Sequence, residues 1–261
     1  LYTHRSANIR KTWFLFTGFF IVIIGIGFVF SQVYGDPSIL LFAVIFSTVM
    51  SLISYWYSDK IVLAMTHARE VTRESARELY NVVENLCIAA GLPVPKIYII
   101  QEAAPNAFAT GRNPEHAVVA VTTGLLARLN RSELEGVIAH ELSHIGNRDM
   151  LVSTVAVILV GFISLISDIF LRSMYWRGGG RSRRGNAGGI LILIGIALAI
   201  LSPIIARLMR MAISRKREFL ADASGALLTR YPDGLASALE KISHDPTPLP
   251  VANNTTAHLW F

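Results

Sequence analysis

One stretch decides the fold of this chain: Gly136-Val137-Ile138-Ala139-His140-Glu141-Leu142-Ser143-His144-Ile145-Gly146-Asn147. It contains the pattern His-Glu-x-x-His. Residues four apart lie on one face of an α-helix, with Cβ atoms about 5–6 Å apart, so His140 and His144 can bind one metal ion together. Glu141 is turned by about 100° around the helix axis, so its carboxylate can face a water molecule beside that ion. Two ligands, an open position and a neighbouring base are the minimal parts of a zinc hydrolase.

The residues around this pattern predict an amphipathic helix. Ser132 and Glu135 have the spacing of a capping box, and Gly146-Asn147 is the expected end. A core helix with two hydrogen-bonded histidines is the alternative, but Glu141 would have no structural use there. Apolar residues recur at intervals of three and four and give the helix one buried face: Leu134, Val137, Ile138, Leu142 and Ile145.

The composition is that of a membrane protein. The 261 residues are 52% hydrophobic and only 16% charged, whereas about 25% of an average soluble domain is charged. The formal net charge is +6, and the positive residues flank apolar segments. This pattern favours a lipid bilayer as the partner and does not favour nucleic acid. The single Cys87 excludes an intramolecular disulfide and a multi-Cys zinc site.

Four long apolar segments predict a chain that crosses the membrane more than once. Each is long enough to span a bilayer as a helix. Lys and Arg precede the first segment and are absent from the short link to the second, which places the N-terminus in the cytoplasm. A signal peptide is not favoured, because a second apolar segment follows at once without a small-residue cleavage site. The segments are residues 12–35, 37–58, 150–167 and 185–206.

The part between the second segment and the histidine helix predicts a small α+β region. In residues 59–92, apolar residues have the spacing of one amphipathic helix, which is expected to end at Gly91-Leu92-Pro93. Residues 96–101, 107–110 and 117–122 are expected to form short strands. An exposed edge strand can hold a substrate peptide by backbone hydrogen bonds, and a plain structural hairpin is the alternative. The residues expected to bind substrate are Asn106, Ala107, Phe108, Ala109 and Thr110.

A third metal ligand is expected on a helix after the fourth apolar segment. A catalytic zinc site needs three protein ligands, and Glu218 fits best. Asp222 lies one turn further along the same face, where it can accept a hydrogen bond from a ligand histidine. The alternative is that Glu218 pairs with Arg215, one turn back on the same helix. A short further helix is expected around residues 235–242.

Three stretches resemble one known family, the membrane-bound M48 zinc metallopeptidases, and within it the HtpX heat-shock proteases. They are Asn106-Ala-Phe-Ala-Thr-Gly111, Val137-Ile-Ala-His-Glu-Leu-Ser-His-Ile-Gly-Asn-Arg-Asp149 and Arg217-Glu-Phe-Leu-Ala-Asp-Ala223. The resemblance implies Zn²⁺ bound by His140, His144 and Glu218, with Glu141 as the catalytic base. It also implies quality control of misfolded or damaged membrane proteins at the cell (inner or plasma) membrane, with the active site facing the cytoplasm. Members of the family usually continue beyond the position of residue 261, so a C-terminally truncated chain is expected.

The predicted fold is mainly α: an integral membrane protein with about four transmembrane helices and a cytosolic α+β zincin-like metalloprotease domain with a small sheet. Residues 1–58 would form the first membrane hairpin, and 59–150 a cytosolic region with the histidine helix. Residues 151–209 would form a second hairpin with an Arg- and Gly-rich loop, and 210–261 would supply the third ligand.

The second hairpin raises a conflict of topology. The three ligands must meet, so this hairpin must begin and end on one side of the membrane. If it crosses fully, the basic residues 172–184 lie outside, against the tendency of positive charge to stay inside. Full crossing is still expected, because both segments have spanning length. A solvated loop near lipid headgroups is favoured for residues 172–184 over an RNA-binding segment.

The predicted activity is that of a zinc metalloendopeptidase. A CAAX-type prenyl-protein peptidase would share the metal chemistry, but more membrane helices would be expected for it. A non-catalytic metal-binding membrane scaffold would not need Glu141. A donor that stabilises the oxyanion should also be present, and the sequence leaves His116, Tyr231 and His244 open for this role.

Overall fold

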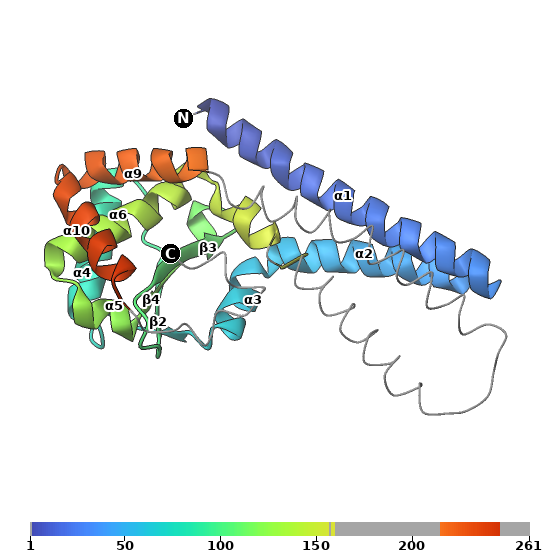
Figure 1. Cartoon of the computed structure of the whole chain (residues 1–261), viewed down its shortest axis with the longest axis horizontal. Coiled ribbons are helices and arrows are strands. Elements are labelled where there is room, and N and C mark those ends of the chain that lie inside the picture. Colours follow the sequence, from blue (N-terminus) through green and yellow to red (C-terminus); the bar gives the residue numbers. More distant parts are fainter. Residues whose placement is uncertain (1, 157, 160–214, 246–261) are drawn as a thin grey trace.

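The structure is a computed structural model that describes residues 2–156, 158–159 and 215–245. The predictions for residues 160–214 and for the chain after residue 245 lie outside this range. A pair of long helices extends from a compact part in which helices surround a small sheet (Figure 1). The elements are α1 (Tyr2–Tyr34), α2 (Ser38–Trp56), α3 (Ser58–Met65), β1 (Arg69–Glu70), α4 (Arg77–Ala90), β2 (Lys96–Ile100), β3 (Ala107–Gly111), β4 (Ala117–Thr122), α5 (Thr123–Arg128), α6 (Arg131–Asn147), α9 (Arg215–Thr229) and α10 (Pro232–Ser243).

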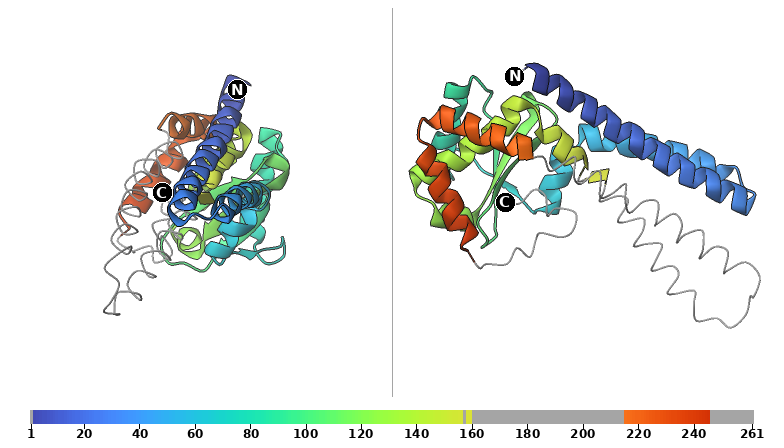
Figure 2. Two further views of the ribbon diagram at one scale, coloured as in Figure 1. Left: turned by 90° about the vertical axis from the view of Figure 1, so that its right-hand side faces the viewer. Right: turned by 45° about the horizontal axis from the view of Figure 1, so that its top comes forward.

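Helices α1 and α2 run side by side as a hairpin, as the views in Figures 1 and 2 agree. Their stretches Ile9–Gln32 and Ser38–Trp56 are long and apolar enough to cross a membrane. A Cβ on Gly27 would collide with Ala43, so small residues allow the two helices to approach closely. Large apolar side chains remain exposed along both helices, as lipid contact requires: Trp13, Phe14, Ile21, Phe28, Leu41, Phe42 and Ile45.

The chain after α6 returns at once to this hairpin. Residues 150–156 and 158–159 are helical. Their apolar side chains form a buried cluster with α1, made of Leu15, Phe16, Phe19, Val152, Val155, Ala156 and Leu159. The helix that carries the histidines is therefore followed directly by a segment packed on the first membrane helix.

Residues 59–92 do not form the single helix that the spacing of their apolar residues predicts. Helix α3 ends beside Thr66, whose hydroxyl donates to the carbonyl of Val62 at 2.9 Å. The next residue, His67, has a left-handed backbone with φ of 52°, and β1 then pairs with β2. Tertiary pairing with β2 overrides the local helical preference here. Helix α4 does end as predicted, at Gly91 with φ of 66°.

The sheet is mixed and has the order β1-β2-β4-β3. Strands β2 and β4 are parallel, and the other two pairs are antiparallel. The three predicted strands are confirmed, and β4 is buried along its whole length. Strand β3 lies at one edge, where it contacts α6. Helix α6 lies at the centre of the compact part and packs against β3, α4, α9 and α10 (Figure 1).

The capping box of α6 lies two residues earlier than predicted. Asn130 Oδ1 accepts from the backbone N–H of Glu133 at 3.0 Å, and Glu133 Oε2 accepts from the N–H of Asn130 at 2.9 Å. Ser132 and Glu135 do not form the predicted pair. Glu133 is favoured because its buried carboxylate also binds Lys241 of α10 at 2.8 Å.

The helices and strands together confirm a fold that is mainly helical with a small mixed sheet.

Candidate metal centre

Helix α6 holds both histidines so that their rings converge. His140 and His144 lie one turn apart on the side that faces α9, and their Nε2 atoms are 3.2 Å apart. Apolar residues on the other sides of α6 anchor the helix in the core of the compact part. This packing fixes the imidazoles, because a helix buried on several sides cannot rotate without exposing apolar surface.

Helix α9 brings a carboxylate to the same point. Glu218 Oε2 lies 3.6 Å from Nε2 of both His140 and His144. The two helices can approach this closely because Gly225 faces the backbone of α6. A Cβ at this glycine would lie only 3.1 Å from the backbone nitrogen of His140.

The three atoms have the spacing that a metal ion requires. Ligand atoms about 2.0–2.2 Å from a tetrahedral ion lie about 3.3–3.6 Å from one another. His140, His144 and Glu218 each offer one such atom, and all three lie within 4.8 Å of each other. The donor set of two imidazoles and one carboxylate matches that of known catalytic zinc sites. The residues therefore fit a metal ion.

Two further carboxylates lie behind the histidines. Asp222 Oδ1 is 2.9 Å from Nδ1 of His140, on the predicted face of α9. Asp149 Oδ1 is 3.0 Å from Nδ1 of His144, a contact that the sequence pattern did not predict. Both contacts favour a proton on Nδ1, which leaves a lone pair on each Nε2 directed at the centre.

Asp149 reaches His144 because the chain reverses immediately after α6. Arg148 has a left-handed backbone with φ of 54°, and the N–H of Asp149 donates to the carbonyl of His144 at 3.2 Å. A signal was available in the sequence: an acidic residue follows the expected helix end, five positions after a ligand histidine. The signal could be used only if the left-handed turn at Arg148 was already known.

The electrostatics of the centre favour a bound cation. Burial lowers the pKa values of His140 and His144, but neighbouring carboxylates outweigh this effect and raise both, His144 well above its ordinary range. The two imidazoles beside Glu218 in turn hold the pKa of its carboxyl group far below the usual value. The same negative charges would favour a metal cation between the imidazoles.

Glu141 lies between the metal group and the sheet. Its carboxylate is buried and accepts a hydrogen bond from the backbone of Ala109 in β3. Burial raises the pKa of Glu141, while His144, His140 and the Ala109 hydrogen bond act in the opposite direction. The net result is a carboxylate that takes up a proton more readily than an exposed Glu does.

The side chains of the predicted substrate-binding residues point mostly into the interior. Asn106, Ala107, Phe108 and Thr110 are buried, and only Ala109 is partly exposed. Thr110, for example, shares a hydrogen bond of 2.9 Å with Thr154. These side chains are therefore not suited to bind a substrate peptide, and only the backbone along the edge of β3 is.

The other histidines raised by the sequence analysis hydrogen-bond locally. His116 Nδ1 lies 2.7 Å from Asn113 Oδ1, and His244 Nδ1 lies 2.8 Å from the carbonyl of Glu240. Neither ring is among the residues that the structure gathers around the metal group.

A metal-binding group beside a buried carboxylate, in a chain with two helices of membrane-spanning length, defines a membrane metallopeptidase. Residues 73–259 match Peptidase family M48, and the chain belongs to this family. Family membership implies a metal cofactor. The resemblance noted in the sequence is thereby confirmed.

Relatives within the family support proteolytic activity. The chain is 47% identical over 265 residues to a protease HtpX homolog of Caldanaerobacter subterraneus subsp. tengcongensis, covering all of this chain and 89% of that protein. It is 51% identical over 233 residues to a protease HtpX homolog of Thermococcus sibiricus, covering 88% of this chain and 79% of that protein. Among solved structures, Ste24p of S. mikatae aligns over 99% of this chain and 64% of that one, with 19% identity and a TM-score of 0.47.

Proposed function

We propose that the chain is a zinc endopeptidase that hydrolyses misfolded or damaged membrane proteins in the cell membrane. The observation that supports this proposal is the position of Glu141, buried beside three ligand atoms that lie 3.2–3.6 Å from one another. A site that only stores metal has no use for such a base, because a buried carboxylate without a ligand role is costly.

In this proposal, His140, His144 and Glu218 hold the zinc ion. A bound zinc ion supplies a Lewis acid, which polarises a peptide carbonyl and makes a water molecule more acidic. Glu141 accepts the proton of the attacking water and delivers it to the nitrogen of the leaving amine. Asp222 and Asp149 hold the imidazoles of His140 and His144 with Nε2 free to act as a ligand.

The backbone of residues 106–110 would hold the substrate as an added strand along β3. Backbone hydrogen bonds do not depend on side chains, so this mode suits a protease that acts on many unfolded segments. It also explains why the side chains of Asn106, Phe108 and Thr110 can be committed to the interior.

The same proposal includes a multi-pass arrangement with the active site facing the cytoplasm. Residues 1–58 and 151–209 would form membrane hairpins, and residues 59–150 and 210–261 would form the catalytic part. Cleavage of residues 172–184 by an added protease, from one side of sealed vesicles at a time, tests this topology. Cleavage from the cytoplasmic side would contradict full crossing of the second hairpin.

Substitution of Glu141 tests the catalytic role. We expect Glu141→Gln to lower casein cleavage by about 10²–10⁴-fold, because the proton acceptor is lost, and to leave the zinc content unchanged. Glu135→Gln is the matched control, since Glu135 lies on the same helix but pairs with Arg131 at 3.0 Å on the surface. Undiminished cleavage by Glu141→Gln would sink the mechanism, and a metal-free Glu141→Gln protein would make this residue a ligand instead.

The scaffold and prenyl-peptidase alternatives make different predictions. A metal-binding scaffold would cleave no casein with or without a chelator. A prenyl-protein peptidase would cleave prenylated peptides in preference to unfolded protein. Cleavage of casein that is lost on chelation therefore favours the endopeptidase.

A further inference from the structure

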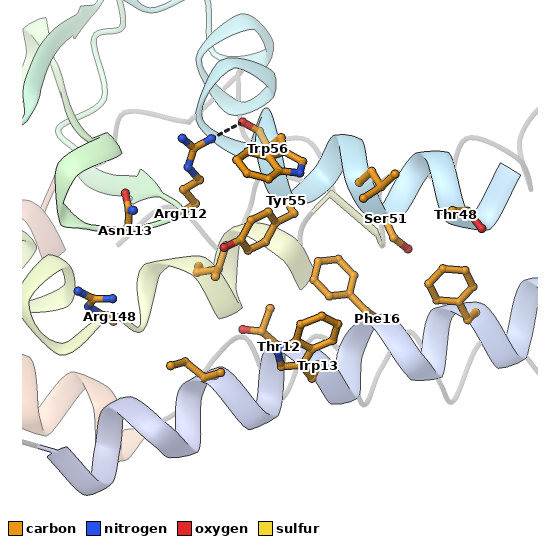
Figure 3. A pocket seen from close by; sticks show the side chains of 14 residues that line it. Thr12, Trp13, Phe16, Thr48, Ser51, Tyr55, Trp56, Arg112, Asn113 and Arg148 are labelled. Atoms are coloured by element: carbon orange, nitrogen blue, oxygen red, sulfur yellow. Dashed lines mark hydrogen bonds between the residues drawn. The ribbon is translucent and has the colours of Figure 1, made fainter. Parts of the chain in front are cut away.

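A cavity of about 530 Å³ lies between the membrane hairpin and the catalytic part (Figure 3). Its walls come from α1, from α2, from the residues after β3 and from those after α6. Apolar side chains such as Phe16, Phe20 and Leu52 line one region. Arg112 and Arg148 line another, toward the catalytic part (Figure 3).

Aromatic residues place this cavity at the level of the lipid headgroups. Trp13, Tyr55 and Trp56 line it, at the ends of the two membrane-spanning stretches that are nearest the catalytic part. Trp and Tyr gather at the boundary between hydrocarbon and water, where their rings contact both. One end of the cavity is therefore at headgroup depth and the other at acyl-chain depth.

The charges in the cavity are all positive. Arg112 and Arg148 line it, and no carboxylate does. The guanidinium of Arg112 lies over the ring of Trp56, 4.7 Å from its centroid, and donates to the Trp56 carbonyl at 3.4 Å. Among the described residues, neither arginine forms an ion pair with an acid. Two guanidinium groups without acidic partners favour an anion with several oxygen acceptors.

A buried hydroxyl points to the same kind of ligand. Ser51 is 8% exposed and lines the cavity, and its Oγ has no hydrogen-bond partner within the described part of the chain. Its side chain points toward α1 across the cavity (Figure 3). Ser47 and Ser54 on the same helix donate instead to backbone carbonyls at 3.1 and 3.0 Å. Buried hydroxyls nearly always have a partner, so a ligand oxygen is expected beside Ser51.

We propose that this cavity binds one anionic phospholipid. The phosphate lies between Arg112 and Arg148, a glycerol-ester oxygen accepts the hydrogen bond of Ser51, and an acyl chain lies along Phe16 and Phe20. A zwitterionic lipid fits less well, because its own cation would lie beside the two arginines. This site is separate from the metal centre and does not depend on proteolytic activity.

Native mass spectrometry of the full-length purified protein tests the proposal, with phosphatidylglycerol and phosphatidylcholine added at equal concentration. We expect one phosphatidylglycerol to be retained in preference to phosphatidylcholine. Arg112→Gln and Arg148→Asn should each weaken its binding about fivefold, since a basic residue near a headgroup contributes about 1 kcal/mol. Asn is chosen at position 148 because it tolerates the left-handed backbone there.

Matched variants separate the cavity from general attraction to anionic membranes. Lys60→Gln is the charge control, because Lys60 lies over the ring of Tyr57 but does not line the cavity. Ser51→Ala should also weaken binding, and Ser47→Ala should not. The midpoint of thermal unfolding shows that each variant is folded.

Three results would overturn the proposal. The first is equal retention of both lipids by the native chain. The second is a loss of binding in Lys60→Gln as large as that in the arginine variants. The third is binding of glycerol 3-phosphate as tight as that of the phospholipid, because the acyl chain would then contribute nothing.

Discussion

Asp149 and Asp222 show how single carboxylates prepare a metal ligand. Each lies within 3.0 Å of the Nδ1 atom of one histidine. A ligand histidine that donates its other N–H to a carboxylate binds metal more tightly, because its orientation and tautomer are fixed in advance. The two acids come from different parts of the chain, so the two imidazoles are oriented independently.

Removal of the Asp149 charge should weaken metal binding. We expect Asp149→Asn to lower the affinity for zinc about 10- to 100-fold, as such partners typically do, measured by competition with a chelating dye. Asp233→Asn, at an exposed position in α10, is the control and should bind zinc like the native chain. An unchanged affinity in Asp149→Asn would show that the contact with His144 has no role in metal binding.

The contribution of Asp149 also shows what the sequence could not supply. His140, Glu141 and His144 follow from helical spacing alone, and Glu218 from the need for a third ligand. Asp149 depends on the left-handed turn at Arg148. A non-glycine residue seldom adopts this conformation, so the acidic residue after the helix end could not be assigned to His144 from the sequence.

At the level of elements, the crossing of α6 and α9 decides the geometry of the metal group. Gly225 has no side chain, and the backbone of His140 lies so close that a Cβ would be only 3.1 Å from its nitrogen. The separation between the imidazoles and Glu218 is therefore set by contact between two backbones. Such a contact has little freedom to adjust, because interiors are packed to the density of crystals.

A methyl group at this crossing should disturb the metal site. In Gly225→Ala, a Cβ 3.1 Å from the His140 nitrogen forces α9 outward, so we expect weaker zinc binding and a lower midpoint of unfolding. Gly146→Ala is the control, since a Cβ there meets nothing closer than 3.8 Å and alanine favours the helix by about 1 kcal/mol. If Gly225→Ala raises the midpoint as Gly146→Ala does, the crossing is not tight.

The junction of α6 and α10 should make stability depend on pH. Burial raises the pKa of Glu133, but hydrogen bonds from Lys241, Ser237 and the Asn130 N–H outweigh this effect and lower it. A lowered pKa stabilises the fold above the unfolded value of about 4.3, and this stabilisation is lost as the pH falls through the folded value. The difference in unfolding midpoint between the native chain and Glu133→Gln should therefore shrink between pH 7 and pH 3. A difference that stays constant between pH 7 and pH 3 would contradict this account.

Elements with strong periodicity were predictable, and those that depend on partners were not. Helices α2 and α6 and strand β4 follow from runs of apolar residues. Strand β1 has two residues and exists only through its pairing with β2. The cap at Asn130 was missed for the same reason, since Glu133 is selected by its contact with Lys241, which lies 108 positions away.

In the whole molecule, the proposed metal ion would link α6 and α9, which residues 148–214 separate along the chain. We therefore expect removal of zinc by a chelator to lower the midpoint of unfolding. A ligand present at 100 times its Kd stabilises a protein by about 2.7 kcal/mol, which corresponds to roughly 5–10 °C for a chain of this size. His144→Gln is the control and should unfold at the same temperature with and without chelator. Identical midpoints for the native chain in both conditions would argue that the fold does not depend on the ion.

The distance along the chain between the ligands has a consequence for the newly made protein. Glu218 follows His144 by 74 residues, and a ribosome adds about 5–20 residues per second. The first two ligands would therefore exist for about 4–15 s before the third is made. During this interval the nascent chain would bind zinc weakly and cleave nothing, so neighbouring nascent proteins would be safe from it. Nascent chains stalled before residue 215 should be inactive, and casein cleavage by such chains would disprove this delay.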